Sequence, residues 1–311
     1  MKKLISLVVP CYNEESVLPD FYNEVVKVMK NMKKIFYEII FIDDGSSDNT
    51  LNIIKDFSKK NRKVKYISFS KNFGKEAAIY AGFDSIKGDY VAVMDADLQD
   101  PPEYIDKMYQ ILEKEDYDVV ALVAKKNKDY NFIRKLFTKL WYLIISKISS
   151  VKQTPGIRDF RLMKREVVDA ILKMKEYNRY SKGIFSFVGF NTKLIEYEIP
   201  KRYKGSSKFS FRKLVSYSVD GITSFSSKPL KLSVYLGLVF CFLSFITILV
   251  IIIKTLLYGD PVPGWPSLAC IIIFVSGVQL FFLGVIGTYI SKIYMEVKKR
   301  PLYIVRERND K

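Results

Sequence analysis

Apolar and polar positions along the first third of the chain predict strands separated by helices. Three short, almost wholly apolar runs are each followed at once by a polar loop: residues 4–9, 37–42 and 90–94. Runs of this length, bounded by turn residues, are typical of buried strands. The segments between them repeat apolar positions at helical spacing: residues 17–32, 47–59 and 75–85. This alternation predicts an α/β fold with a mostly parallel sheet and right-handed crossovers, the second helix being capped by Ser46 or Ser47.

Two long apolar stretches near the C-terminus indicate a membrane protein. Residues 232–253 and 268–290 contain no charged side chain, and each is long enough to cross about 30 Å of hydrocarbon. The connecting residues 259–267 contain no Lys or Arg, whereas residues 201–231 and 292–311 are rich in both. The positive-inside rule therefore predicts two spans with everything before residue 230 in the cytoplasm. Two buried helices of a soluble protein are the alternative.

A basic amphipathic helix is predicted over residues 132–149, because its apolar positions share one face and its Lys and Arg residues lie on the others. Two interpretations stay open. The helix either packs on the sheet or lies in the membrane interface, with Trp141 and Tyr142 as its anchors. Residues 206–227 form a second segment of this kind, leading to the first span.

The charge and composition of the chain narrow the classes of molecule that it is expected to bind. The chain has 50 Lys and Arg against 33 Asp and Glu, a net charge of +17. In a chain with spans, an anionic membrane surface and phosphorylated substrates account for this excess better than nucleic acid, for which no binding module is present. The three cysteines have neither zinc-site nor disulfide spacing, and because the chain has no histidine, any catalytic base is another residue type.

The polar loops after the apolar runs hold the candidate chemistry. Ligands of a parallel sheet lie beyond the carboxyl ends of its strands, so residues 10–15, 43–46 and 95–99 are expected to meet at one edge. Asp95 and Asp97, with Gln99 beside them, supply the oxygen ligands that Mg²⁺ or Mn²⁺ prefers, and substrate phosphates commonly complete such a site. Solvated turn residues are the alternative interpretation of this acidic pair.

Motifs in these loops and beyond resemble glycosyltransferase family 2. Within it the chain resembles the polyprenyl-phosphate glycosyltransferases, a group that includes bactoprenol glucosyltransferases and dolichol-phosphate mannose synthases. The resemblance covers essentially the whole chain, and its motifs are Val8-Val9-Pro10-Cys11-Tyr12-Asn13-Glu14-Glu15, Asp43-Asp44-Gly45-Ser46-Ser47-Asp48, Lys71-Asn72-Phe73-Gly74-Lys75, Asp95-Ala96-Asp97-Leu98-Gln99, Asp159-Phe160-Arg161-Leu162-Met163, Gly205-Ser206-Ser207-Lys208-Phe209 and Arg300-Pro301-Leu302-Tyr303.

The resemblance implies the nucleotide-sugar fold called GT-A and a role for each matching residue. Pro10, Tyr12 and Glu14 would line the base pocket, Asp43 or Asp44 would contact the base or ribose, and Lys75 and Asp95 would also bind the donor. Asp95, Asp97 and Gln99 would hold Mg²⁺ or Mn²⁺. Asp159 and Asp97 would be the catalytic residues, Asp159 lying near the reacting centre. The acceptor phosphate would contact Arg161, Arg179, Arg202 and Lys208. Turn chemistry, helix capping and surface solvation are the competing structural roles.

The implied organisation is a cytoplasmic catalytic domain followed by a membrane hairpin. The expected boundaries are 1–205 for the domain, 206–229 for a juxtamembrane amphipathic segment, 230–258 and 267–292 for the spans, 259–266 for the extracytoplasmic loop and 293–311 for a basic tail. Lys125, Lys126 and Lys128 stand where relatives often have arginines, and lysine lacks the bidentate fork of arginine. Their contact with phosphate is therefore left open.

The implied function is metal-dependent, inverting transfer of one hexose from a nucleotide diphosphate sugar to undecaprenyl or another polyprenyl phosphate at the cytoplasmic face of the plasma membrane. UDP-glucose is the expected donor, and a homo-oligomer is possible. The Gln-x-x-Arg-Trp signature of processive synthases is absent, which favours transfer of a single sugar. The alternatives are a glycosyltransferase acting on a membrane glycolipid or polysaccharide, and a non-catalytic nucleotide-sugar-binding partner of another membrane protein.

Overall fold

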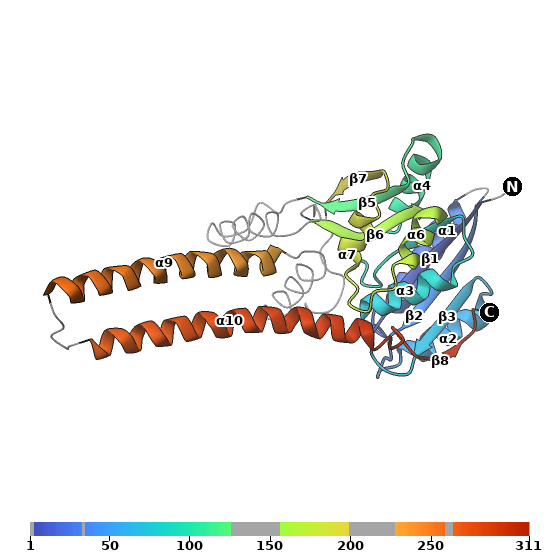
Figure 1. The fold of residues 1–311 in the computed structure, drawn as a ribbon. Helices are drawn as coiled ribbons and strands as arrows, with labels where there is room; N and C mark the ends of the chain where they lie inside the picture. The colour runs from blue at the N-terminus through green and yellow to red at the C-terminus, as the bar shows by residue number, and fades with distance from the viewer. Residues whose placement is uncertain (1–2, 33–34, 126–155, 199–227, 259–263, 311) are drawn as a thin grey trace.

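The computed structural model describes residues 3–32, 35–125, 156–198, 228–258 and 264–310 (Figure 1). The basic helix expected at 132–149, the amphipathic segment at 206–227, and the candidate residues Arg202 and Lys208 lie outside these ranges.

An eight-stranded sheet organises the N-terminal part of the chain, in the order β7-β5-β6-β4-β1-β2-β3-β8. Strands β4, β1, β2 and β3 run parallel, while β6 and β8 run antiparallel to their neighbours β4 and β3. The bounds are β1 Lys3–Cys11, β2 Ile35–Asp43, β3 Val64–Phe69, β4 Tyr90–Val93, β5 Val119–Ala124, β6 Ile157–Lys164, β7 Thr192–Tyr197 and β8 Val305–Arg308. The three strands predicted from apolar runs are confirmed as β1, β2 and β4.

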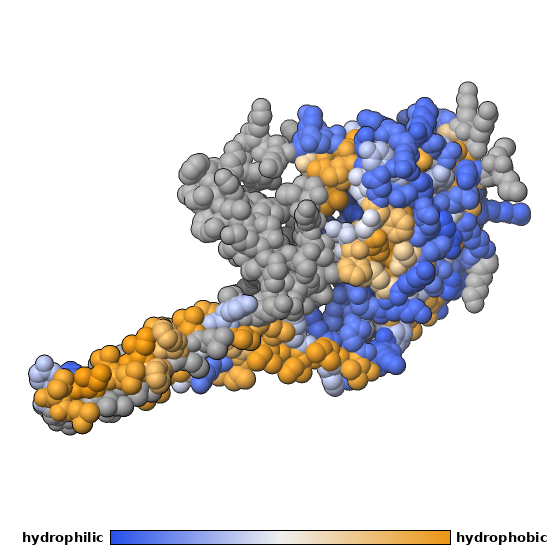
Figure 2. Space-filling view, turned by 45° about the horizontal axis from the view of Figure 1, so that its top comes forward, coloured by the Kyte–Doolittle hydropathy of each residue, from blue (hydrophilic) through white to orange (hydrophobic). Residues whose placement is uncertain are grey.

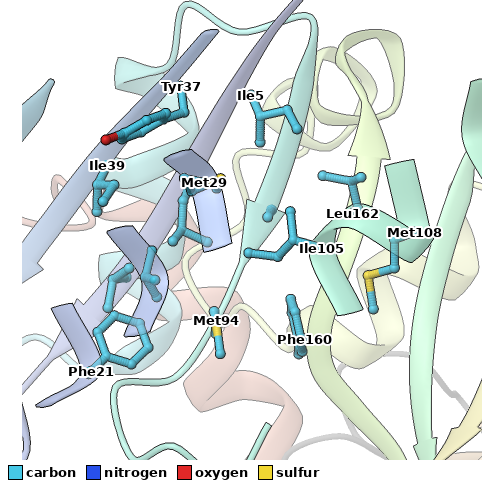
Figure 3. Close-up of a cluster of buried hydrophobic side chains, with 14 of the residues drawn as sticks. Ile5, Phe21, Met29, Tyr37, Ile39, Met94, Ile105, Met108, Phe160 and Leu162 are labelled. Carbon is cyan, nitrogen blue, oxygen red and sulfur yellow. The ribbon is translucent and has the colours of Figure 1, made fainter. Parts of the chain in front are cut away.

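Helices cover both faces of the sheet, because alternate residues of each central strand point to opposite faces. Leu7 and Val9 of β1 pack in the core beneath α1, α2 and α4, whereas Val8 packs beneath α3, α6 and α7. Figure 3 shows part of the first core, where Phe21 of α1 and Ile105 and Met108 of α4 pack on the sheet. The bounds are α1 Leu18–Asn31, α2 Thr50–Lys60, α3 Lys75–Ser85, α4 Tyr104–Lys114, α6 Arg165–Lys173 and α7 Ser181–Phe187.

The three helices predicted from the pattern are present as α1, α2 and α3, but the expected cap of α2 is wrong. The helix begins at Thr50, with Asn49 at its N-cap. Ser46 and Ser47 instead hold the neighbouring loop: the Ser46 hydroxyl accepts a bond from the N–H of Asn13, and the N–H of Ser47 donates to the Asn13 side chain.

Two long helices, α9 (Lys228–Tyr258) and α10 (Trp265–Val297), form a hairpin that projects from the domain (Figure 1). Phe240 and Phe274 contact each other across the hairpin, with ring centroids 5.9 Å apart. Apolar side chains follow the hairpin surface in Figure 2, in contrast to the largely polar domain. Within the described residues, one stretch is long and apolar enough to cross a membrane, Phe274–Val297. The expected pair of spans is therefore not confirmed as a pair.

The C-terminus returns to the sheet, which corrects the expectation of a basic tail at 293–311. Strand β8 pairs with the edge strand β3, and the ring of Tyr303 stacks on Phe69 with centroids 4.9 Å apart. Helix α10 also continues beyond the expected end at residue 292, to Val297. The sheet therefore includes a strand that follows the hairpin in the sequence.

Candidate active site

Two loops interlock at the carboxyl ends of β1 and β2. The N–H of Asp44 donates to the carbonyl of Cys11 (2.9 Å), and the N–H of Glu14 donates to the Thr50 hydroxyl (2.8 Å). The Glu15 carboxylate accepts a bond from the N–H of Asn49 (2.9 Å). Asn13 adopts a left-handed backbone conformation, with φ 53°, which its short polar side chain tolerates. These contacts hold the loop of residues 10–15 in place. We call this loop the wall of the expected base pocket.

The predicted base-pocket residues Pro10, Tyr12 and Glu14 all lie on this wall, and Tyr12 is exposed. Their contact with a nucleotide base stays a prediction.

Asp43 and Asp44 are buried beneath the wall, and protein donors occupy both oxygens of each carboxylate. Asp43 accepts bonds from the N–H of Ser46 and the hydroxyl of Ser68. Asp44 accepts from the N–H groups of Phe73 and Gly74, at 2.6 and 2.9 Å. Both carboxylates therefore hold loops in place in this structure, and a contact of either one with a base or ribose stays a prediction.

The glycine at position 45 lets the loops after β2 and β3 approach closely. Its φ is +65°, and a Cβ there would lie 2.4 Å from the carbonyl carbon of Lys71. A side chain is excluded both by backbone conformation and by space. Asp44 and Gly45 together hold residues 71–74 in place, and helix α3 begins at Lys75.

Lys75 joins two acidic residues that come from different strands. Its Nζ lies 2.7 Å from Asp95 Oδ1 and 2.5 Å from Asp159 Oδ2. Asp95 follows the end of β4, and Val93 of β4 pairs with Arg161 of the antiparallel β6. Asp159, two residues earlier in β6, is thereby placed opposite Asp95 at the carboxyl edge of the sheet. The structure thus brings together Lys75, Asp95 and Asp159, which we call the ion-pair cluster.

Opposing charges set the protonation of this cluster. Burial alone would lower the pKa of Lys75, but the charges of Asp95 and Asp159 outweigh it and raise that pKa. Burial raises the pKa of Asp95, and the negative charge of Asp159 raises it as well. Burial would also raise the pKa of Asp159, yet the Lys75 charge outweighs it and holds that pKa well below the usual range. Asp159 is therefore an ionised carboxylate and a weak base.

Asp97 and Gln99 lie on the loop after Asp95, but the Gln99 side chain is used elsewhere. Asp97 Oδ1 accepts a bond from the N–H of Gln99 (3.1 Å), and Gln99 Oε1 accepts from Arg158 Nη2 (3.3 Å). The same arginine binds Asp100 at 3.0 Å, and Asp100 also accepts a bond from the Tyr197 hydroxyl. Arg158 and Asp100 were not among the residues predicted for this site. Asp100 is an acidic residue in the loop after β4, so its residue type could have marked it as a candidate. The sequence does not show that its side chain points inward.

The carboxylates of this loop can hold a divalent cation only if a substrate supplies further ligand oxygens. In the described ranges no group of three or more Asp, Glu, Cys or His side chains is arranged to hold a metal. Asp95 and Asp97 supply two hard oxygen donors, and the cluster already attracts a cation in the form of Lys75. Two carboxylates completed by phosphate oxygens are a common magnesium arrangement.

Of the predicted acceptor-phosphate residues, Arg161 is engaged inside the protein. It is buried, its guanidinium lies 3.6 Å from the centroid of the Phe185 ring, and it donates to the carbonyls of Asp159 and Arg158. Burial lowers its pKa to about 10. Arg161 therefore braces the strand that carries Asp159, and its contact with an acceptor phosphate stays a prediction.

Arg179 lies instead on a pocket of about 300 Å³ next to the ion-pair cluster. Its guanidinium is 4.5 Å from the centroid of the Tyr80 ring, and it donates to the carbonyl of Met174. Lys75 and Glu76 of α3 line the same pocket, together with Lys292 of α10. Glu76 accepts bonds from the N–H and hydroxyl of Ser181.

The fold agrees with the family whose profile matches the chain. The profile described as Glycosyl transferase family 2 matches residues 6–172, and the one described as GtrB C-terminal hairpin matches residues 228–293. The chain belongs to glycosyltransferase family 2, so it is a glycosyltransferase with the GT-A α/β fold predicted from the sequence.

Several relatives align over nearly their whole length. The SfII prophage-derived bactoprenol glucosyl transferase of Shigella flexneri is 43% identical over 97% of both chains. The bactoprenol glucosyl transferase of Shigella phage SfV is 43% identical over 99% of both. The prophage bactoprenol glucosyl transferase homolog of Escherichia coli (strain K12) is 41% identical over 97% of this chain and 98% of its own.

Proposed function

We propose that the protein transfers one glucose from UDP-glucose to a polyprenyl phosphate, with inversion, at the cytoplasmic face of the plasma membrane. The observation that carries the proposal is the 43% identity, over 97% of both chains, to a protein named bactoprenol glucosyl transferase. The ion-pair cluster at the carboxyl edge of the sheet supports it, since Lys75 of α3, Asp95 of the loop after β4 and Asp159 of β6 converge there.

The donor diphosphate is assigned to the Asp95–Asp97 loop. Asp95 and Asp97 would hold Mg²⁺ or Mn²⁺, which supplies positive charge to a departing diphosphate when bound. Lys75, fixed at the start of α3 by the Asp44 anchor, adds a permanent positive charge beside them. Gln99 is not needed for this assignment, because Arg158 occupies its side-chain oxygen.

The acceptor phosphate acts as its own nucleophile. The second pKa of a phosphate monoester is about 6, so the group is largely a dianion at neutral pH. An oxygen of this phosphate bonds to the anomeric carbon from the side opposite the leaving UDP, and the configuration inverts. Because Lys75 keeps the pKa of Asp159 low, Asp159 orients the reacting groups rather than removing a proton.

Two spans and a cytoplasmic domain are proposed for the placement in the membrane. The lengths of α9 and α10 and the match to the GtrB C-terminal hairpin support a pair of spans. The return of the chain to β8 supports one side for both ends of the hairpin. Extracting a prenyl tail into water costs about 0.8 kcal/mol per CH₂, so the enzyme has to work at the lipid surface.

A panel of labelled nucleotide sugars tests the proposal. Membranes that contain the protein are incubated with each donor, and label is followed into the organic phase with and without added polyprenyl phosphate. We expect transfer from UDP-glucose that depends on the added lipid. Transfer only to a preformed glycolipid or polysaccharide would favour the second enzymatic function. Nucleotide-sugar binding without transfer to any acceptor would favour a non-catalytic partner.

A further inference from the structure

The pocket beside the ion-pair cluster lies where the membrane hairpin meets the catalytic domain. One wall is the first turn of α3 with the preceding Phe73, the second is the loop 177–180, and the third comes from the C-terminal part of the chain through Lys292 and Leu302. Lys75 belongs to both features, because it lines the pocket while its Nζ contacts Asp95 and Asp159. The pocket therefore lies between Lys292 near the end of α10 and Lys75 of the ion-pair cluster.

Glu296 fixes this arrangement. Its Oε1 accepts a bond from the N–H of Tyr177 at 2.6 Å and lies 3.4 Å from the N–H of Asn178. Lys292 and Glu296 are four residues apart on α10, so they lie on the same face of the helix. By holding the loop 177–180 against that face, Glu296 sets the width of the pocket between Lys292 and Arg179.

The pocket lining is positively charged and partly aromatic. The lining includes three cationic side chains, Lys75, Arg179 and Lys292, and one carboxylate, Glu76. The Lys75 ammonium is paired with Asp95 and Asp159, so binding of a phosphate in the pocket would depend on Arg179 and Lys292. The Glu76 carboxylate accepts bonds from the N–H and hydroxyl of Ser181, and burial raises its pKa. Phe73 and Tyr177 add apolar surface next to the cations. Such a lining suits a phosphate attached to a hydrocarbon chain better than the polar sugar of a nucleotide.

We propose that this pocket receives the phosphate of the lipid acceptor, with Lys292 and Arg179 as its binding residues and Glu296 as the residue that positions α10 to form it. The proposal rests on the proposed function and adds the acceptor's path. The lipid tail stays beside α10 in the membrane while its phosphate passes between Lys292 and Arg179 toward Asp159.

Steady-state kinetics of the purified full-length protein in mixed micelles tests the proposal, with UDP-glucose and a polyprenyl phosphate varied in turn. Lys292→Gln should raise KM for the lipid about tenfold, the loss expected for one charge-assisted hydrogen bond. Its kcat and its KM for UDP-glucose should stay unchanged. Lys292→Arg, which keeps the charge, should restore the wild-type KM. Lys298→Gln is the matched control, because Lys298 is an exposed lysine near the same helix end outside the pocket lining.

Glu296 gives an independent test of the positioning role. Glu296→Ala should raise KM for the lipid, whereas Glu296→Gln should not, because the amide oxygen still accepts the bond from Tyr177. A Lys292→Gln enzyme that matches Lys298→Gln would overturn the inference, as would a rise in KM confined to UDP-glucose. A wild-type enzyme that transfers nothing to polyprenyl phosphate would instead overturn the proposed function, so the two failures are distinguishable.

Discussion

Replacing Lys75 by methionine removes the only cation that contacts both Asp95 and Asp159 among the described residues, while keeping most of the side-chain volume. Breaking a fully buried ion pair costs about 3 to 5 kcal/mol. The Lys75 side chain is 39% exposed, and those of Asp95 and Asp159 are 28% and 20% exposed. Solvent screening reduces the cost accordingly, and we expect about 2 kcal/mol. For a domain of this size that corresponds to a decrease in apparent Tm of about 4 to 8 °C.

The stability lost in Lys75→Met should be partly recovered when one of the two carboxylates that lose their partner is also neutralised. Thermal unfolding of the purified protein at pH 7 is compared for wild type, Lys75→Met, Asp159→Asn and the double variant, which forms a double-mutant cycle. The double variant should be more stable than Lys75→Met. Lys59→Met is the control, because Lys59 pairs with Asp56 on the surface and the two side chains are 75% and 61% exposed. Additive losses in the cycle would refute the coupling of Lys75 to Asp159.

Three further predictions address the metal, the acidic residue near the acceptor and the C-terminal strand. Asp97→Asn should abolish transfer without affecting expression, and EDTA should mimic it until Mg²⁺ or Mn²⁺ is restored; full turnover in metal-free buffer would contradict the assignment. Asp159→Asn should lower kcat without changing nucleotide affinity or the fall in rate below a pH of about 6, which the lipid phosphate sets; a shifted pH profile would make Asp159 a base. Tyr303→Ala should cost about 1 to 2 kcal/mol, because it removes the partly buried stack on Phe69; an unchanged Tm would mean that β8 is not held by this contact.

The arrangement of the catalytic edge could be predicted from the sequence, because parallel strands bring their carboxyl ends together whatever their separation along the chain. The position of Asp95 could be predicted as soon as β4 was recognised as a strand. The position of Asp159 could not be predicted in this way, because it lies at the start of an antiparallel strand whose pairing with β4 is a long-range contact. The motif predicted that Lys75 binds the donor, and its position between Asp95 and Asp159 depends on Asp44 and Gly45 holding the preceding loop.

The features that the sequence did not reveal depend on where side chains point and on weak local patterns. Asp43 and Asp44 are the expected residue types for a ligand site, yet both are buried. Asp43 accepts bonds from the N–H of Ser46 and the Ser68 hydroxyl, and Asp44 accepts from N–H groups of the loop after β3. Strand β8, Val305–Arg308, has one apolar and three charged residues, a stretch too short and too polar to predict a strand. Glu296 is one charge in a basic segment, and its role emerges only when α10 meets the loop at Tyr177.

The central claim is tested most directly by the structure of the product. Purified protein is supplied with radiolabelled UDP-glucose and polyprenyl phosphate, and the lipid product is isolated and its anomeric configuration determined by NMR. We predict a single glucose joined through the phosphate in the β configuration, because UDP-glucose is α-linked and the transfer inverts. An α-linked product, a chain of several sugars, or free glucose without any lipid-linked sugar would contradict the account.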